Sequence, residues 1–339
     1  MKKIKIIHGN CIDKIKELKD NSIDSVVSSP PYFGLRDYGA DGQFGLEKTY
    51  QDYLANTVKV FETFKPKLKD TATIWWNVGD SYSSGKRTST TNQSLRGNKE
   101  YGVTRTPVQN GIKEKDLLMI PNRVAIALQD AGWYIRSEII WHKPNPMPES
   151  VKDRPTSCHE KIWLITKSKK YYYDAEAIKE PITDTTAIRL LQKNIDNQEG
   201  SSRANGGMKS NGNMKAMGRK KFDKNMGGSG TSFVDHSGYK KADGTYMINP
   251  TRNKRNVWTV TTKPFKGAHF ATYPKDLIEP CIKAGCPENG TILDPFGGSG
   301  TTGIVAALNN RNAILIELNP EYIKIAEDRI EKELGLFND

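Results

Sequence analysis

The chain has 339 residues, of which 36% are hydrophobic, and it carries a formal net charge of +12. That length is enough for one large domain with an inserted module. No run of about 18 apolar residues marks a membrane span, and the first ten residues, MKKIKIIHGN, lack the apolar stretch of a secretory signal. We therefore expect a cytoplasmic protein that does not enter a membrane.

The four cysteines, Cys11, Cys158, Cys281 and Cys286, do not occur in pairs at metal-ligand spacing. Free thiols are the simplest interpretation, with neither a disulfide framework nor a zinc site. The histidines share no ligand spacing either, so we expect no metal.

The basic charge is concentrated in one segment. Between residues 181 and 260 there are 14 Lys or Arg against 6 Asp or Glu, so this segment supplies +8 of the net +12. Such a concentration is suited to neutralising the phosphates of a nucleic acid. The alternative interpretation is a solvated loop that keeps the protein soluble.

The first 80 residues alternate between short apolar runs and helical spacing. Apolar runs predict strands over residues 3–8, 22–28 and 71–78, and helical spacing predicts helices over 12–18 and 50–64. The second strand stops at Pro30 and Pro31, which cannot continue a central strand. The chain must therefore turn outward at the carboxyl end of that strand, the edge at which parallel α/β sheets bind ligands.

The rest of the chain has two polar interruptions within an α/β pattern. We expect a polar loop over residues 83–115 and an inserted module without periodicity over 184–256. Between them the pattern predicts a helix over 117–131 and paired strands over 133–141 and 161–166. After them it predicts helices over 274–283, 301–309 and 320–334, with strands over 291–294 and 313–317.

These elements predict an α/β fold with a doubly wound, mostly parallel sheet and an inserted module. We divide the chain into a first part (1–180), an inserted module (181–260) and a last part (261–339).

A glycine-rich turn follows the strand over 291–294. From Gly298 to Gly303 the sequence fits G-x-G-x-x-G, between a predicted strand and a predicted helix, where bare backbone can approach a ligand. Glu317 ends the next strand, where a carboxylate can accept hydrogen bonds from ribose hydroxyls. A dinucleotide oxidoreductase would use such a turn for pyrophosphate, whereas Asp294 before it suits the cationic amino-acid end of S-adenosylmethionine. Taken alone, the turn predicts a nucleotide cofactor without choosing between them.

The tetrapeptide Ser29-Pro30-Pro31-Tyr32 lies at the outward turn. An exocyclic amino group of a nucleobase is a poor nucleophile, because its lone pair is delocalised into the ring. The Ser29 hydroxyl and the Pro30 carbonyl could accept hydrogen bonds from such a group. Tyr32 offers an aromatic ring on which an extruded base could stack.

The two motifs together resemble those of the amino-methyltransferase family of DNA methyltransferases, whose members methylate cytosine N4 or adenine N6. Ser29–Tyr32 resembles the family's catalytic tetrapeptide, and Asp294–Gly300 its cofactor loop. The catalytic motif precedes the cofactor loop, an order similar to the family's beta class. That class has a circularly permuted motif order, with target-recognition sequence between the motifs, where the basic segment falls.

The resemblance implies S-adenosylmethionine as cofactor and assigns two sets of residues. The catalytic set is Ser29, Pro30, Pro31 and Tyr32. The cofactor-binding set is Asn10, His269, Phe270, Tyr273, Asp294, Pro295, Phe296, Gly298, Gly300, Thr301 and Glu317; the run His269–Pro274 resembles a further cofactor motif of the family. At Asn10 many relatives carry an acidic residue, although an asparagine oxygen can also accept a hydrogen bond.

The implied function is site-specific DNA methylation of a flipped base. Serine at the first position of the tetrapeptide is the family's common cytosine-N4 form, so we expect cytosine N4, with adenine N6 as the alternative. A methyltransferase that acts on RNA or on a protein amide is the competing class. The expected partners are double-stranded DNA and a cognate restriction endonuclease, with the protein as a monomer or homodimer.

Cytosine C5 chemistry would need a cysteine nucleophile, usually after a proline. Pro280-Cys281 has that form, but it falls inside a predicted helix, and we interpret it as packing. We likewise assign four tryptophans to the core: Trp75, Trp76, Trp133 and Trp141.

Overall fold

The computed structural model describes residues 3–37, 40, 42–83, 111–183, 238–240, 246–248, 251–262 and 273–335. The chain forms two compact units. The larger unit combines Met1–Ala177 with Arg255–Asp339, and the smaller unit is Ile178–Lys254. Most of the polar loop expected over 83–115 and most of the expected module lie outside the described residues.

In the smaller unit the described backbone consists of two strand pairs. The strands β6 (Glu180–Pro181) and β9 (Thr251–Arg252) pair antiparallel, as do β7 (Gly238–Lys240) and β8 (Tyr246–Ile248). The Arg252 guanidinium forms an ion pair with Glu180, with a nitrogen–oxygen distance of 3.0 Å.

The larger unit is built on an eight-stranded sheet in the order β1-β12-β11-β2-β3-β5-β4-β10. The five strands from β1 to β3 are mutually parallel, β5 is antiparallel to both of its neighbours, and β10 is parallel to β4. The predicted mostly parallel α/β fold is thus confirmed. The strand bounds are β1 Ile4–His8, β2 Ile23–Ser28, β3 Leu68–Val78, β4 Tyr134–His142, β5 His159–Thr166, β10 Val257–Thr259, β11 Thr291–Asp294 and β12 Asn312–Glu317.

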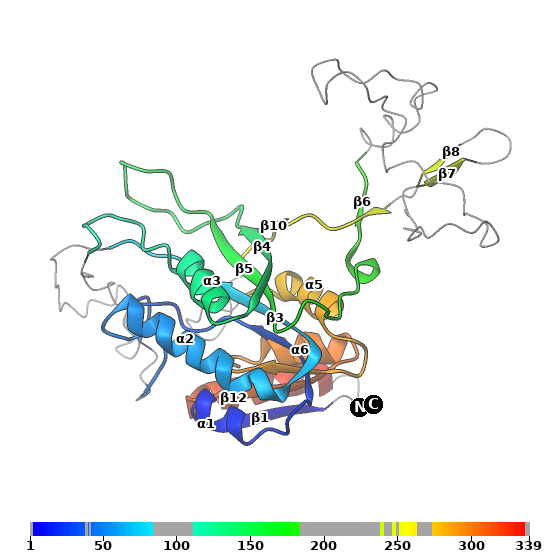
Figure 1. Cartoon of the computed structure of the whole chain (residues 1–339), viewed down its shortest axis with the longest axis horizontal. Helices are drawn as coiled ribbons and strands as arrows, with labels where there is room; N and C mark the ends of the chain where they lie inside the picture. The colour runs from blue at the N-terminus through cyan, green and yellow to red at the C-terminus, as the bar shows by residue number, and fades with distance from the viewer. Residues whose placement is uncertain are drawn as a thin grey trace, which may run out of the picture. The chain divides into compact units, whose positions relative to one another are not determined.

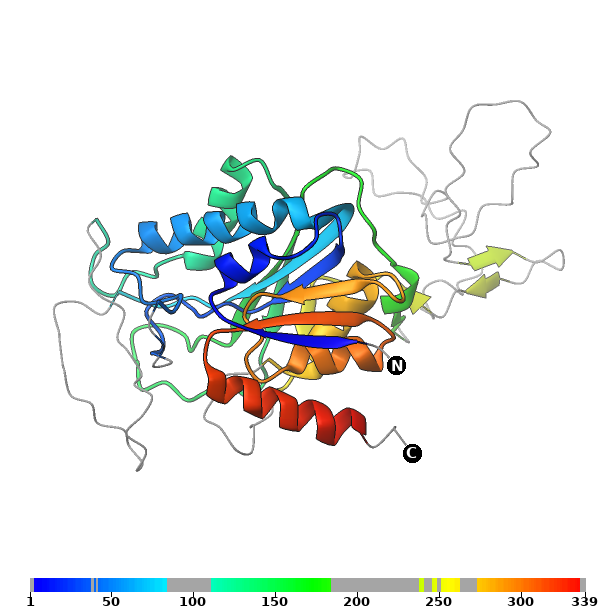
Figure 2. The ribbon, with the colours of Figure 1, turned by 90° about the horizontal axis from the view of Figure 1, so that it is seen from below.

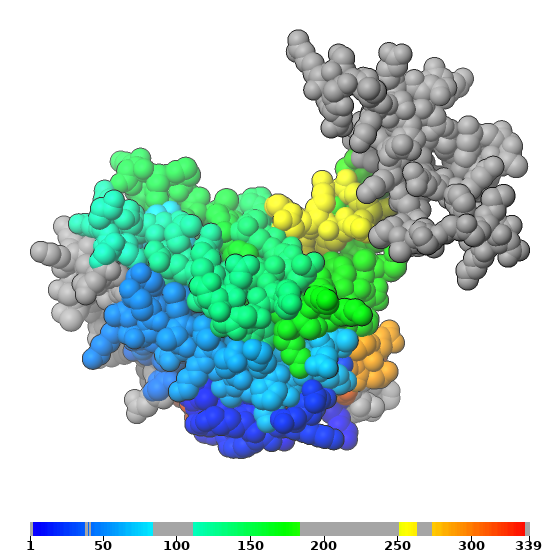
Figure 3. Space-filling view, viewed as in Figure 1, coloured from blue at the N-terminus to red at the C-terminus, as the bar shows by residue number. Residues whose placement is uncertain are grey.

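Helices cover both faces of the sheet. The contacting helices α1 (Cys11–Lys16), α2 (Tyr50–Phe64) and α3 (Ile120–Asp130) lie on one side, and α5 (Lys275–Gly285), α6 (Thr301–Leu308) and α7 (Pro320–Leu334) lie on the other (Figures 1 and 2). Figure 3 shows the outer sides of α2 and α3 next to each other at the surface. No helix in the described ranges is long and apolar enough to span a membrane.

The first and the last strand of the described chain, β1 and β12, pair with each other at one edge of the sheet. Strand β1 pairs in parallel with β12, so that His8 lies opposite Glu317, and the Gly9 amide donates to the Glu317 carbonyl at 2.9 Å. Residues from the start of the chain are therefore delivered to the carboxyl end of β12 (Figure 2).

Between β11 and β2, the helical connections switch from one side of the sheet to the other. From β2 the chain runs through α2 to β3 on one side, and from β11 it runs through α6 to β12 on the other. The carboxyl ends of β2 and β11 are adjacent, because Val26 pairs with Leu293. Such a switch point is where open α/β sheets leave a crevice for ligands.

The core is rich in aromatic residues from β3 and α2. Trp76 meets Phe61 edge-on with ring centroids 5.0 Å apart, and Phe61 meets Trp133 at 5.3 Å. All four tryptophans assigned to the core are buried, and so is Cys281, which confirms its assignment to packing inside α5.

One helix begins later than its hydrophobic pattern predicts. The pattern runs from residue 117, but α3 begins at Ile120, because Met119 has a left-handed backbone (φ 58°) and Pro121 occupies the first turn. The Asp80 carboxylate accepts from the Ile120 amide at 3.1 Å. An acceptor from the end of β3 therefore sets the start of α3, a contact that local spacing does not reveal.

Candidate active site

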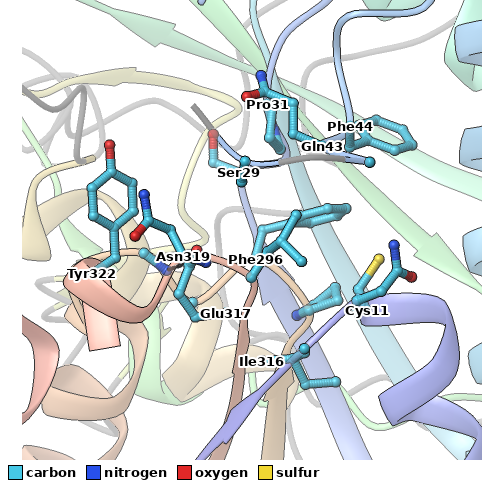
Figure 4. Close-up of a pocket in the computed structure, with 18 of the residues that line it drawn as sticks. Cys11, Ser29, Pro31, Gln43, Phe44, Phe296, Ile316, Glu317, Asn319 and Tyr322 are labelled. Carbon is cyan, nitrogen blue, oxygen red and sulfur yellow. Dashed lines mark hydrogen bonds between the residues drawn. The ribbon is translucent and has the colours of Figure 1, made fainter. Parts of the chain in front are cut away.

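A cavity of about 320 Å³ opens at the carboxyl ends of β2, β11 and β12. Ser29 and Pro31, which follow β2, border it from one side, and Phe296 and Glu317 border it from the cofactor-loop side (Figure 4). The tetrapeptide Ser29–Tyr32 and the glycine-rich turn, which are far apart in the sequence, therefore border one cavity.

The Asp294 carboxylate joins the two halves of this site. It is 1% exposed, and it accepts hydrogen bonds from the Ser28 hydroxyl at 2.6 Å, the Thr302 hydroxyl at 2.5 Å, the Tyr273 hydroxyl at 3.1 Å and the Phe296 amide at 3.1 Å. Burial raises the pKa of Asp294, and these donors oppose the shift. A buried carboxylate needs such donors to offset its lost hydration.

The glycine-rich turn is fixed against α7 behind the cavity. Gly300 adopts φ +79°, and a Cβ there would lie 3.0 Å from the Ala326 Cβ, so both conformation and space favour glycine. The Arg329 guanidinium donates to the Ser299 carbonyl at 2.6 Å and to the Thr301 hydroxyl at 3.1 Å. The turn is therefore held in a defined shape by a partly buried cation.

Glu317 presents a carboxylate at the edge of the cavity. Its two oxygens accept from the Gly298 and Asn319 amides, each at 2.8 Å. Burial raises the pKa of Glu317, and the backbone donors oppose the shift. Each carboxylate oxygen has a second lone pair, so the group can accept further hydrogen bonds from a ligand while it stays fixed.

The opposite part of the cavity is apolar. The Phe44 and Phe296 rings lie with centroids 5.3 Å apart, and Ile316 is another lining residue. Asn10 also borders the cavity, and its side-chain oxygen accepts from the Ile12 amide at 2.9 Å, which caps α1. An apolar slot next to a fixed carboxylate is suited to a nucleoside.

The tetrapeptide is tied to its surroundings through its side chains. The Tyr53 hydroxyl donates to the Pro31 carbonyl at 3.2 Å. The Ser29 hydroxyl donates to the Tyr32 oxygen at 3.2 Å, and the Tyr32 hydroxyl donates to Glu160 at 2.6 Å.

The structure brings together most of the residues proposed from sequence. Of the described ones, Pro30, Tyr32, Asp294 and Gly300 are not among the residues that line the cavity. His269 and Phe270 lie outside the described residues. Nine line the cavity: Asn10, Ser29, Pro31, Tyr273, Pro295, Phe296, Gly298, Thr301 and Glu317.

Sequence reasoning did not identify several residues that build the site. Phe44 lies in a segment without periodicity, and Arg329 belongs to a helix whose charged positions resemble an ordinary solvated face. Ser28 was assigned only to a strand, and Glu160 lies one residue before the strand predicted over 161–166. The position of Ser28, directly before the tetrapeptide, was the one signal available.

A family model described as DNA methylase, of the N6 and N4 methyltransferases, matches residues 23–328. The chain belongs to this family. Its members use S-adenosylmethionine, so this protein is an S-adenosylmethionine-dependent DNA methyltransferase.

Curated relatives match along nearly the whole chain. The type II methyltransferase M.Cfr9I of Citrobacter freundii is 39% identical over 328 residues, which cover 97% of this chain and 88% of that protein. M.SmaI of Serratia marcescens, also a type II methyltransferase, is 38% identical over 330 residues, which cover 97% and 91%.

Solved structures share the fold. The cytosine-N4-specific PvuII DNA methyltransferase superposes with a TM-score of 0.58 at 16% identity, covering 98% of this chain and 90% of that one. A Thermus thermophilus protein described as a DNA modification methylase, solved with S-adenosyl-L-methionine, gives 0.55 at 18% identity, covering 97% and 94%.

The residues around the cavity fit S-adenosylmethionine. The lining combines a fixed carboxylate acceptor at Glu317 with an apolar wall formed by Phe44 and Phe296, which suits ribose hydroxyls beside a flat base. A Cβ at Gly298 would have no heavy atom nearer than 3.9 Å, so the loop leaves space beside its backbone.

Asp294→Ala should weaken the binding of S-adenosylmethionine by about tenfold or more, because it removes the acceptor that fixes Ser28, Thr302 and Phe296. Isothermal calorimetry measures the affinity, and circular dichroism verifies that the variant is folded. Asp328→Ala, an exposed aspartate on α7, is the control with the same charge change. Unchanged cofactor affinity in a folded Asp294→Ala would contradict this role.

Proposed function

We propose that this enzyme methylates the exocyclic N4 of a flipped cytosine in duplex DNA. The observation that carries the proposal is Ser29, an uncharged acceptor at the cavity edge, in a tetrapeptide joined through Ser28 and Asp294 to the cofactor loop. The amino group to be methylated would donate to the Ser29 oxygen. That contact favours a tetrahedral nitrogen, whose lone pair is available for attack.

Glu317 would hold the ribose of S-adenosylmethionine, and Phe44 and Phe296 would form the apolar wall against which its adenine packs. Asn10, Gly298 and Thr301 complete that side of the cavity. When bound, the cofactor supplies a methyl group on a sulfonium. Asp294 would act by accepting from the Phe296 amide, which shapes the loop after β11, and from the Tyr273 hydroxyl, which comes from the segment before α5.

The residues of this chain would contribute to the reaction by positioning the base and its amino group. Pro31, fixed by Tyr53, and Ser29 would hold the amino nitrogen toward the cofactor, and the ring of Tyr32 would support the flipped base. No covalent intermediate with the protein is required, because the amino nitrogen is itself the nucleophile.

The basic segment over 181–260 would provide the target-recognition surface. Its +8 charge suits phosphate contacts, which make binding strongly dependent on salt. The relatives M.Cfr9I and M.SmaI are type II methyltransferases, and we extend to this chain a place in a restriction–modification pair, with a separate endonuclease of the same recognition sequence.

Adenine N6 is the second candidate. Both bases present an exocyclic amino group, and an acceptor at Ser29 would serve either. We favour cytosine because serine at this position is typical of cytosine-N4 members of the family, whereas adenine-N6 members more often carry Asp.

The test is mass spectrometry of nucleosides from sequence-diverse DNA after incubation with labelled S-adenosylmethionine. We expect labelled N4-methylcytosine; the control reaction omits the protein. Labelled N6-methyladenine would keep the fold and the chemistry but overturn the choice of base. Label in RNA or protein alone would overturn the proposed substrate.

The pKa of Glu317 predicts how cofactor affinity depends on pH. Burial raises this pKa above the ordinary 4.5, so the carboxylate gains a proton, and loses acceptor capacity for ribose, at a higher pH than an exposed glutamate does. Affinity should therefore fall as the pH is lowered from about 8 to about 5.

Glu317→Gln should bind S-adenosylmethionine more weakly at neutral pH and should show a smaller fall in affinity on acidification. Calorimetry across the pH range compares it with the wild type and with Glu327→Gln, an exposed site on α7. An equally steep fall in Glu317→Gln would assign the pH dependence to another group.

A further inference from the structure

Glu160, the second residue of β5, reaches the tetrapeptide after β2 from the other side of β3, the strand that lies between β2 and β5. Its Oε2 accepts from the Tyr32 hydroxyl at 2.6 Å and from the Asn77 side-chain amide at 3.1 Å. Its Oε1 is ion-paired with Lys143, and both side chains of that pair are largely buried, with 15% and 19% of their surface exposed. Three donors therefore converge on one carboxylate.

These contacts fix where the proton of Tyr32 lies. Two oxygens 2.6 Å apart need a proton between them, and this distance is typical of a hydroxyl donating to a carboxylate. An ionised Glu160 that is paired with Lys143 can only accept. The hydroxyl proton must therefore come from Tyr32.

The direction of the Tyr32 hydroxyl also determines the direction of the Ser29 hydroxyl. Because the single hydroxyl proton of Tyr32 is directed to Glu160, the Tyr32 oxygen can only accept from Ser29, which lies 3.2 Å away. The single hydroxyl proton of Ser29 is then directed to Tyr32. Toward the cavity, which it lines, Ser29 presents lone pairs alone.

We propose that Glu160, held by Lys143 and Asn77, is a positioning residue that determines specificity for amino groups. By orienting the Tyr32 and Ser29 hydroxyls, it makes Ser29 an acceptor, so that a base with an N–H at that position is bound and one with a carbonyl oxygen is rejected. This inference rests on the proposed function and extends it to a residue outside the tetrapeptide.

The position of Tyr32 is fixed on a second side as well. A Cβ at Gly79, directly after β3, would lie 2.5 Å from the Tyr32 ring, so the ring packs against bare backbone. Gly79 restricts the position of the Tyr32 ring, and Glu160 restricts the direction of the Tyr32 hydroxyl. Together these two contacts fix the oxygen toward which the Ser29 hydroxyl is directed.

The test uses full-length Glu160→Ala on DNA containing the site methylated by the wild type. We expect turnover (kcat) to fall by about 10- to 100-fold, the loss typical of a hydrogen bond to a charged group, with cofactor affinity unchanged. Lys143→Met combined with Glu160→Leu removes the ion pair as a unit and leaves no buried charge unpaired; it should show the same loss. Glu149→Ala is the matched control. It breaks the Glu149–Arg154 ion pair, which lies in the segment that connects β4 to β5, and the variant should keep its turnover.

Two readouts separate orientation from mere structural support. Tyr32→Phe keeps the ring and breaks the chain of hydroxyls, so adding Glu160→Ala to it should cost nothing more. The second readout is the affinity for an oligonucleotide whose target amino group is replaced by a carbonyl, divided by the affinity for the normal site. This ratio should be lower for the wild type than for Glu160→Ala. Comparing each oligonucleotide across the two proteins cancels its effect on base pairing.

Additive losses in the double variant, an unchanged preference for the amino base, or wild-type turnover in Glu160→Ala would each overturn the inference while leaving the proposed function in place. Absence of methylated DNA with the wild-type protein would instead remove the proposed function, and the inference with it.

Discussion

The site depends on one hydrogen-bonded junction, that of Ser28 with Asp294. Ser28 ends β2 and Asp294 ends β11, two adjacent parallel strands whose connections run to opposite sides of the sheet. The residue after Ser28 begins the tetrapeptide that we propose to be catalytic, and the residues after Asp294 form the loop that we propose to bind the cofactor. A buried carboxylate at this point needs donors, and it finds them on both segments, which fixes their relative position. The two motifs act as one site because they share an acceptor.

The structure divides the work between residues that border the cavity and residues that hold them. Glu317 and Ser29 line the cavity, whereas Asp294, Arg329 and Glu160 form hydrogen bonds with residues beside the lining, namely Ser28, Ser299 and Tyr32. Each of these three side chains has several partners, which restricts it to one orientation. Preorganisation of this kind suits methyl transfer to a weak nucleophile, since placement must supply much of the rate.

Much of the fold could be predicted from sequence, because apolar periodicity and proline positions are local signals. The helix over 50–64 and the strand that stops before Pro30 are examples. Of the described site residues, those in the two motifs could be found for the same reason. The supporting residues could not, because Glu160 contacts Tyr32 across 128 positions and Arg329 reaches Ser299 from a helix with many exposed charges. Their roles arise from pairing of strands and packing of helices, and neither leaves a local pattern.

The most direct test of this account is a crystal structure of the protein with S-adenosylmethionine bound. The account predicts the ribose hydroxyls on Glu317, the adenine packed against Phe44 and Phe296, and the sulfonium methyl directed toward Ser29, with Asp294 still bonded to Ser28. A cofactor bound elsewhere, or one whose methyl is directed away from Ser29, would contradict the claim that the tetrapeptide and the loop form a single catalytic site.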